Sequence, residues 1–161
     1  MGKKGFTLVE LLATIVIISI VTLMGSVGIA AAKKGINQHI WNTNIELIEA
    51  AAENFGIDKK DYIKKLDPSI YSCKIDDQTI SPCLTITVQT LINRNYLNTK
   101  ETIEYNDIKD YKVIINKTVD KESVTVPSDE EKNFANGYYV NNAKIYIYVE
   151  KDIVYTKYAG L

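Results

Sequence analysis

The chain has 161 residues, of which 46% are apolar and 24% charged, an ordinary globular composition that suffices for one domain with a modest core. The formal net charge is −1, and no basic patch is interleaved with aromatic residues. The sequence therefore gives no reason to propose a nucleic-acid ligand. Residues 6–32 form an apolar run, whereas the sequence after Lys33 is polar. The run exceeds the roughly 20 apolar residues that a helix needs to cross a bilayer.

Glu10 is the only ionisable residue in the apolar run 6–32. A carboxylate in hydrocarbon costs about 2.5 to 3.5 kcal/mol even on the lenient insertion scale. We therefore expect a specific interaction that compensates the charge of Glu10.

Three interpretations account for the run. An ordinary secretory signal has a basic start, an apolar stretch of about 7 to 15 residues and a small-x-small cleavage site. Lys3, Lys4 and the alanines at 30–32 fit that plan, but the run is too long for it and contains Glu10. A plain signal anchor leaves Glu10 unexplained. In the third interpretation residues 1–5 are a leader that is removed, and the apolar helix stays in the mature protein.

The stretch KKGFTLVELL, residues 3–12, resembles the class III prepilin signal of type IV pilins and related pseudopilins. Its basic pair is followed by glycine, phenylalanine, threonine, leucine and a glutamate five residues into the mature chain. The resemblance implies that a prepilin peptidase cuts between Gly5 and Phe6 and methylates the new amino terminus of Phe6. The remainder of the chain resembles the family only in its layout.

Cleavage would give Glu10 a partner. The freed amine of Phe6 is protonated near neutral pH, because the unperturbed pKa of an α-amino group is about 7.7 to 8.0, and methylation leaves it a cation. A neighbouring subunit shifted along a filament would bring this amine to Glu10. In a dry helical core an unpaired partner would cost about 3 to 5 kcal/mol. Glu10 is therefore predicted to set the register of assembly and not to act as a catalytic acid.

The helix is predicted to continue to about Phe55, with residues 33–56 as its amphipathic C-terminal half and Gly56 as its C-cap. At about 1.5 Å per residue, a helix over 6–55 would be about 75 Å long, and the surplus beyond a bilayer would hold a head domain. The apolar residues at three-and-four spacing are Ile36, Ile40, Leu47, Ile48, Ala51, Ala52 and Phe55.

Three glycines, Gly25, Gly28 and Gly35, weaken this helix by about 1 kcal/mol each relative to alanine. They are the expected centre of any local melting in a filament, since the chain lacks the proline that the resembled family often has in this part of the helix. Close packing between small residues of neighbouring helices is the other interpretation. Both stay open.

Residues 57–161 are predicted to form an α+β head, in which a small antiparallel sheet packs on the long N-terminal helix. Short helices are expected within 58–66 and over 87–93. Strands are expected over 111–118, 123–126, 137–140, 144–150 and 153–158, with Asn136-Gly137 and Asn141-Asn142 as turn signals.

The predicted strand 144–150 alternates clearly between two kinds of side chain. Ile145, Ile147 and Val149 share the face that we expect to cover the helix. Tyr146 and Tyr148 share the opposite face, which would meet solvent or a neighbouring subunit.

Cys73 and Cys83 are the only cysteines, and no histidine lies nearby to complete a metal site. In an oxidising compartment they are predicted to form a disulfide. Closing a loop of this size is worth about 2.5 to 3 kcal/mol in the chain-entropy model. Two free structural thiols are the alternative, which a cytoplasmic head would favour.

The sequence contains no nucleophile elbow, phosphate-binding glycine loop or cluster of zinc ligands. His39, the sole histidine, is expected to be a packed or exposed residue of the helix. Oxygen donors at 128–131, with Asn133 and Asn136, have the chemistry of calcium ligands, as in the heads of major pseudopilins of type II secretion. Their spacing matches no calcium-loop template, so a solvated acidic turn is predicted. No catalytic residue, metal or cofactor is therefore predicted.

The sequence thus predicts a structural prepilin and not an enzyme. It would span the cytoplasmic membrane once, and then join an extracellular filament, a fimbrium of the kind that serves cell adhesion and motility. The resemblance implies as partners other copies of the chain, the prepilin peptidase, a platform protein and an assembly ATPase. A pseudopilin of type II secretion or competence DNA uptake is one alternative. A tethered or secreted binding protein, with an ordinary signal and a mature terminus near Lys33, is the other.

Overall fold

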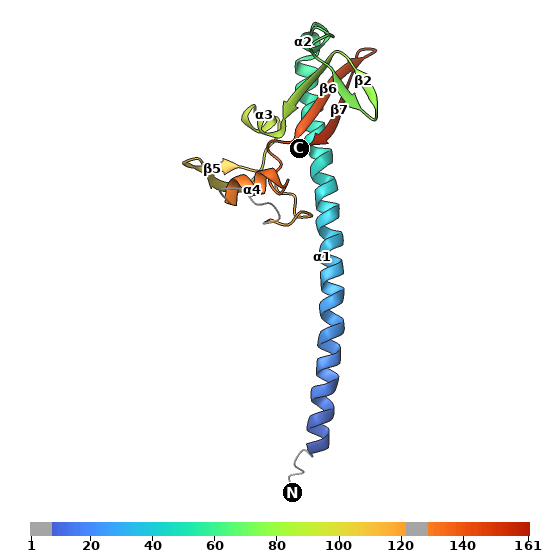
Figure 1. Cartoon of the computed structure of the whole chain (residues 1–161), viewed down its shortest axis with the longest axis vertical. Coiled ribbons are helices and arrows are strands. Elements are labelled where there is room, and N and C mark those ends of the chain that lie inside the picture. Colours follow the sequence, from blue (N-terminus) through green and yellow to red (C-terminus); the bar gives the residue numbers. More distant parts are fainter. Residues whose placement is uncertain (1–7, 122–128) are drawn as a thin grey trace. The chain divides into compact units, whose positions relative to one another are not determined.

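The computed structural model describes residues 8–121 and 129–161, of which residues 20–28, 30, 129 and 130 are described by their backbone only. The chain divides into two compact units, Met1–Asn37 and Gln38–Leu161. The α+β class predicted from the sequence is confirmed. In chain order (Figure 1) the elements are α1 (Leu8–Asp58), α2 (Lys60–Lys64), β1 (Cys73–Ile75), β2 (Gln78–Ile80), β3 (Cys83–Thr87), α3 (Val88–Asn93), β4 (Thr102–Tyr105), β5 (Ile108–Lys112), α4 (Asp129–Ala135), β6 (Lys144–Glu150) and β7 (Ile153–Gly160).

Helix α1 has 51 residues and is the only element described in the first unit. Its helical backbone passes through Gly25, Gly28 and Gly35 without interruption. The side chains at 8–19 are all exposed, and the large apolar ones range from 48% for Val16 to 81% for Leu8. The helix thus forms where the apolar run predicts it, with its apolar side chains uncovered.

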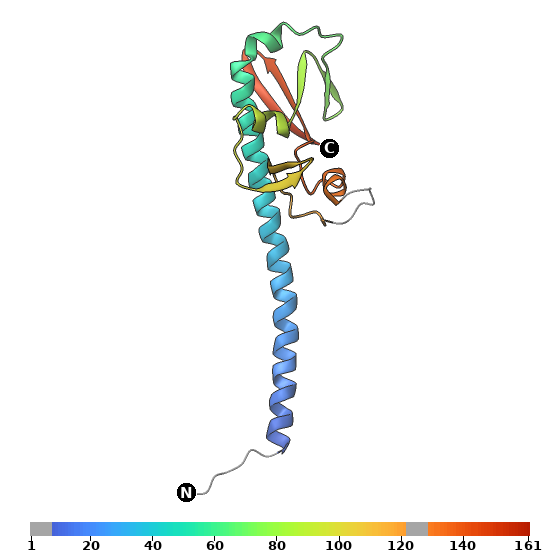
Figure 2. The same cartoon turned by 90° about the vertical axis from the view of Figure 1, so that its left-hand side faces the viewer.

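A three-stranded antiparallel sheet packs on the C-terminal part of α1 in the second unit (Figure 2). Its strand order is β3-β6-β7. Ile145 and Ile147 of β6 are fully buried, as are Ile48 and Ala52 of α1, and all four belong to one hydrophobic core. The alternation predicted for 144–150 is confirmed, because these isoleucines face the core while the tyrosines of β6 are only half-buried.

Gly56 brings α1 and this sheet together. A Cβ at this position would lie 2.6 Å from Val154 Cγ1 and 2.8 Å from Ile147 Cγ2. Real Cβ atoms do not approach other atoms so closely, so only glycine allows this separation of helix and sheet. The C-cap predicted at Gly56 is wrong, because α1 continues to Asp58. Glycine serves close backbone approach as well as helix termination, and the sequence pattern does not separate the two uses.

The amphipathic stripe predicted for α1 is only partly buried. Ile36, Ile40 and Leu47 are 59%, 46% and 56% exposed. Trp41 is buried in their place, and its ring meets that of Tyr158 edge-on, with 5.8 Å between ring centroids. The predicted residues that are buried are Ile48, Ala51, Ala52 and Phe55.

Three hairpins have two-residue turns with positive φ at both central residues, between 46° and 72°. This is the geometry of type I′ turns, which suit the twist of the flanking strands. No turn contains glycine, so the strands β1, β2 and β4 escaped prediction. The turn pairs are Asp76-Asp77, Asn106-Asp107 and Lys151-Asp152.

Two predicted strands are largely wrong. Only the first two residues of 111–118 belong to a strand, β5, and 137–140 contains none. The two segments run side by side through one isolated bridge, Ile115 to Tyr139. Gly137 lies two residues beyond the end of α4 with a φ of 82°, the position and conformation that glycine commonly adopts after a helix, and it is not part of a hairpin turn. The strand predicted at 123–126 lies outside the described residues.

The fully buried Asn141 explains why a regular ladder does not form beside it. Its Oδ1 accepts a hydrogen bond from the Ile114 N–H at 3.2 Å, and its Nδ2 donates to the Lys112 carbonyl at 2.8 Å and to the Gln89 side chain. The Asn141 carbonyl also accepts from the Gln89 N–H at 2.9 Å. One side chain thus takes backbone groups that a neighbouring strand would otherwise bind.

The short helices are close to their predicted places. Thr87 caps α3, because its Oγ1 accepts a hydrogen bond from the Thr90 N–H at 3.3 Å. Helix α2 lies against the β6–β7 turn, where Lys60 Nζ is 2.8 Å from Asp152 Oδ2 and Lys64 binds the other carboxylate oxygen. Hydrogen bonds from Lys60 and then Lys64 lower the pKa of Asp152 from 3.8 to about 2.

Gly56→Ala is expected to destabilise the protein by about 1 to 3 kcal/mol, the usual cost of overpacking. The added methyl group would displace the branched side chains of Ile147 and Val154, although alanine is the better helix former. Urea unfolding of the purified protein, followed by circular dichroism, measures the change. Gly35→Ala is the matched control, since a Cβ there meets nothing within 4 Å and should not lower stability. An unchanged midpoint for Gly56→Ala would contradict the close approach.

Candidate assembly site

The N-terminal site predicted from the sequence begins just before the described residues, because Gly5 and Phe6 lie outside them. Glu10 lies in the first turn of α1, where the positive end of the helix dipole favours a carboxylate. Its side chain is exposed, as are its neighbours along residues 8–19. The structure therefore places Glu10 on a helix surface that another chain can reach.

Two hydroxyl groups within the apolar run bind the helix backbone. Thr14 Oγ1 donates to the Leu11 carbonyl, and Ser19 Oγ donates to the Ile15 carbonyl, each at 2.8 Å. Each donor is thus satisfied inside its own helix. Such internal pairing suits surroundings that offer no water, whether lipid or the core of a protein assembly.

The described apolar side chains of the first unit form an extended uncovered surface. Leu8, Val9 and Ile29 are each more than 70% exposed. Soluble monomers rarely expose contiguous apolar patches beyond a few hundred Å², and larger ones mark protein or membrane contacts. The surface around Glu10 is therefore suited to association.

The predicted disulfide is present between Cys73 and Cys83, with their Cα atoms 5.7 Å apart. It joins β1 to the first residue of β3, and both cysteines are buried. The Cys83 N–H also donates to the Tyr71 carbonyl at 2.9 Å. The bond therefore ties the β1–β2 hairpin to the main sheet.

The other sequence candidates do not converge on a reactive centre. His39 was expected to be either a packed or an exposed residue of the helix, and it is exposed on α1. The predicted acidic turn is wrong in part, because helix α4 begins at Asp129, while Ser128 lies outside the described residues. Within the described part of the chain, no three or more histidines, cysteines, aspartates or glutamates are placed to hold a metal ion.

The two asparagines proposed near the acidic segment have separate surroundings. Asn136 Nδ2 donates to the carbonyls of Asp120 and Lys121 at 2.7 and 3.0 Å, so it holds a loop in place. Asn133 is 3% exposed, and its Oδ1 has no hydrogen-bond partner among the described residues. Neither arrangement brings their oxygens together as a ligand set.

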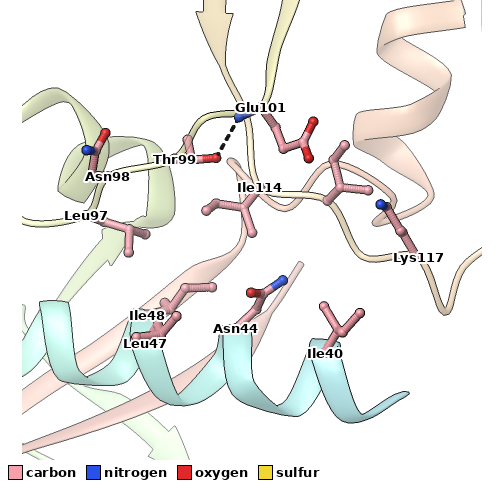
Figure 3. A pocket seen from close by; sticks show the side chains of 11 residues that line it. Ile40, Asn44, Leu47, Ile48, Leu97, Asn98, Thr99, Glu101, Ile114 and Lys117 are labelled. Carbon is pink, nitrogen blue, oxygen red and sulfur yellow. Dashed lines mark hydrogen bonds between the residues drawn. The ribbon is translucent and has the colours of Figure 1, made fainter. Parts of the chain in front are cut away.

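Sequence reasoning missed a groove of about 240 Å³ in the second unit, which is lined by both apolar and polar side chains (Figure 3). Ile40 and Leu47 of α1 form one wall, and Leu97 and Ile114 belong to the opposite wall. The signal in the sequence was the stripe on α1, which includes Ile40 and Leu47. Periodicity alone did not show that these two residues would stay uncovered.

The comparisons with known proteins identify the N-terminal segment. Residues 1–26 match the family model described as the prokaryotic N-terminal methylation motif. This is the class III prepilin signal, which includes residues 3–12. No curated protein and no solved structure matches the chain.

The motif defines a class: proteins processed by prepilin peptidase and passed to an assembly machinery. The motif points to a structural protein that is type IV pilin-like or pseudopilin-like, and the α+β architecture is consistent with that class. Across the described residues, we find no helix that combines the length and the apolar character of a membrane span.

Removing the disulfide is expected to lower stability by about 2.5 to 3 kcal/mol, because the open loop gains freedom in the unfolded chain. The Cys73→Ser, Cys83→Ser double variant avoids leaving one reactive thiol. Thermal unfolding of purified protein measures the shift, and reduction of the wild type should reproduce it. Two readily alkylated thiols in wild-type protein isolated without reductant would contradict the bridge.

Proposed function

We propose that this chain is the prepilin of a type IV pilus-like filament. Residues 1–5 are the leader, and residues 6–32 anchor the chain in the cytoplasmic membrane before assembly and form the filament core afterwards. Residues 33–56 continue the helix into the head, residues 57–161, which the filament carries on its surface. The observation that carries the proposal is the methylation motif at residues 1–26.

The apolar run supports the anchoring step. The complete run 6–32 contains one ionisable residue, near its start, and is longer than the roughly 20 residues that a span requires. An α-helix satisfies its own backbone hydrogen bonds, so it can leave water. Thr14 and Ser19 add side-chain donors that are already paired within the helix.

The charge of Glu10 supports the polymerisation step. Membrane insertion alone gives no reason for a carboxylate in the run, whereas a filament supplies a cation, the methylated amine of Phe6 on a neighbouring copy. Such a pair is favourable only in one axial register, since a shifted neighbour leaves both charges unpaired in an apolar core. Glu10 would therefore select the register as well as strengthen the contact.

The disulfide supports an extracellular head. Disulfides persist in oxidising compartments and are rare in the cytosol. Cys73 and Cys83 both belong to the second unit, so this unit would lie on the outer side of the membrane. The prepilin peptidase, a platform protein and an assembly ATPase would act on the other end of the chain.

A pseudopilin of type II secretion or competence DNA uptake is the second candidate, because it carries the same processing motif. Filament length separates the two functions. Electron microscopy of cells with and without the gene should show long surface fibres that disappear on deletion. Normal surface fibres after deletion, with a secretion or uptake defect, would favour the pseudopilin.

Gly5→Leu is expected to block processing, because the peptidase must accommodate a small residue before the scissile bond. The variant should accumulate in the membrane as a precursor heavier by the leader, and fibres should be absent. Mass spectrometry of the wild-type protein should show an N-methylated Phe6. Gly2→Leu is the matched control, since it changes a glycine of the leader away from the cut and should leave processing intact. A mature chain that starts at Lys33 would contradict the proposal.

Glu10→Gln is expected to spare membrane insertion but to impair assembly. Insertion becomes easier when a charge leaves the apolar run, while the buried amine of the neighbouring Phe6 loses its partner. The yield of sheared fibres, from cells with the variant as their only copy, measures assembly. Glu53→Gln removes a charge from an exposed position of the same helix and should assemble normally. Wild-type fibre yields for Glu10→Gln and Glu10→Ala would show that Glu10 merely reaches the membrane surface.

A further inference from the structure

A second recess, of about 470 Å³, lies between α3 and β5 in the second unit (Figure 1). Its volume is within the range of about 300 to 1,000 Å³ that is typical of small-molecule sites. The residues that define this α3–β5 recess are Gln89, Asn93 and Asn95 on one side and Ile108, Asp110 and Tyr111 on the other. Amide and carboxylate groups thus line a site with room for a small ligand.

A chain of hydrogen bonds fixes the orientation of the amides on the α3 side. The Ile114 N–H can only donate, so Asn141 accepts it with Oδ1 at 3.2 Å, and Asn141 Nδ2 donates to the Lys112 carbonyl at 2.8 Å. The same Nδ2 donates to Gln89 Oε1, and Gln89 Nε2 donates in turn to Asn93 Oδ1 at 2.7 Å. The chain ends at Asn93 Nδ2, whose N–H groups have no acceptor among the described residues.

Asn95 adds a second amide to the same side of the recess. It lies two residues beyond α3 with a φ of 60°, the left-handed conformation that asparagine and glycine adopt after a helix. Its N–H donates to the Ile92 carbonyl at 3.1 Å, and the Tyr96 N–H donates to the Leu91 carbonyl at 3.0 Å. The Tyr96 hydroxyl donates to Asp58 Oδ2 at 2.6 Å. The backbone that carries the Asn95 amide is therefore held in place.

The β5 side supplies acceptors and apolar surface. Asp110 is exposed, and its carboxylate has no hydrogen bond or ion pair with any residue that the structure describes. Ile108 is 53% exposed on the same strand, and Tyr111 is half-buried. A ligand would thus meet unpaired donors on one side, unpaired acceptors on the other and apolar surface beside them.

The charges of the recess cancel. Its lining contains one acidic residue, Asp110, and one basic residue, Lys112. Lys112 Nζ donates to Asn98 Oδ1 at 3.4 Å, so the ammonium group binds a residue outside the lining while the apolar stem contributes to the recess. An anion would meet the Asp110 carboxylate without a dedicated cation. The recess therefore disfavours phosphates and acidic sugars.

We propose that the α3–β5 recess binds a neutral sugar, either free or at the end of a glycan chain. A hydroxyl group both donates and accepts, so a ring with several adjacent hydroxyls satisfies the Asn93 and Asn95 amides together with the Asp110 carboxylate. The C–H side of such a ring is apolar and would cover Ile108. The inference goes beyond the proposed filament function and does not depend on it.

Saturation-transfer NMR on the purified full-length protein tests the site. The probes are glucose, galactose, mannose and N-acetylglucosamine, each as the free sugar and as its methyl glycoside, in a detergent without a sugar headgroup. At least one probe should receive saturation from the protein. Binding of the methyl glycoside would show that the end of a chain fits, whereas binding of the free sugar alone would assign the site to a free monosaccharide. No transfer to any probe would overturn the inference.

Substitutions in the recess locate the binding. Asp110→Ala removes the carboxylate acceptors and should weaken binding several-fold, while Asp110→Asn keeps one acceptor and should be intermediate. Asn95→Gly removes an amide without backbone strain, because glycine adopts a positive φ readily, and should also weaken binding. Asp61→Asn, at an exposed position of α2, is the matched control. Wild-type affinity in Asp110→Ala and Asn95→Gly, with folding confirmed by circular dichroism, would overturn the inference.

Modified sugars test the chemistry of recognition. A site built to bind hydroxyl groups rejects an analogue that lacks one, so at least one monodeoxy analogue of the best probe should bind several-fold more weakly. Glucose 6-phosphate and N-acetylneuraminic acid should bind more weakly than the best neutral probe, because they bring a negative charge to Asp110. Equal binding of all monodeoxy analogues, or tighter binding of either acidic sugar, would overturn the inference.

Discussion

The close approach of α1 to the β6–β7 pair at Gly56 is the contact on which the second unit depends. Because glycine lacks a side chain, Ile147 and Val154 can lie directly against the helix backbone. The same approach brings Ile48 and Ala52 into a core with the inner face of β6. Strand β3 then completes the sheet, and its end continues directly into α3, which covers the core with Val88, Leu91 and Ile92.

A smaller aromatic cluster depends on this core through Asn141. Val113, Phe134 and Tyr139 are its buried members, and partly buried tyrosines surround them. Asn141 joins the cluster's segments to α3, because it binds the backbone on both sides of Val113 and the side chain of Gln89. A buried polar side chain with several satisfied hydrogen bonds specifies one arrangement, since any shift leaves a polar group unpaired.

The parts predictable from the sequence are those governed by local pattern. Periodicity located α1, strict alternation located β6, and the presence of only two cysteines, with no histidine nearby, indicated the disulfide. The hairpin turns at Asp76-Asp77 and Asn106-Asp107 use aspartate and asparagine where glycine is the stronger signal, so they escaped notice. The segment 111–118 has strand-like composition, but its backbone forms hydrogen bonds with the side chain of Asn141, which lies far along the sequence.

The same distinction applies to the site. Gly5, Phe6 and Glu10 belong to one short motif, so their roles could be predicted without any knowledge of the fold. The groove joins α1 to residues about 50 to 70 positions later, such as Leu97 and Ile114. Only the folded chain brings these residues together, and only the folded chain shows that Trp41 is buried while Ile40 and Leu47 stay uncovered. No local pattern contains that information.

Each edge of the main sheet has one backbone N–H that is bonded within the chain, which constrains how heads can associate. At the β7 edge, Glu49 of α1 accepts the Tyr158 N–H at 2.8 Å, and the Glu49 carbonyl accepts from Thr156 Oγ1 at 3.2 Å. At the β3 edge, the Cys83 N–H binds the Tyr71 carbonyl, beside the disulfide. Open edges would allow strand pairing between crowded copies, a contact that is strong but poorly specific. With these two N–H groups bonded by the chain itself, each edge offers a shorter stretch of backbone to a neighbouring strand, which favours contacts through side-chain surfaces, whose shape and charge can define a single register.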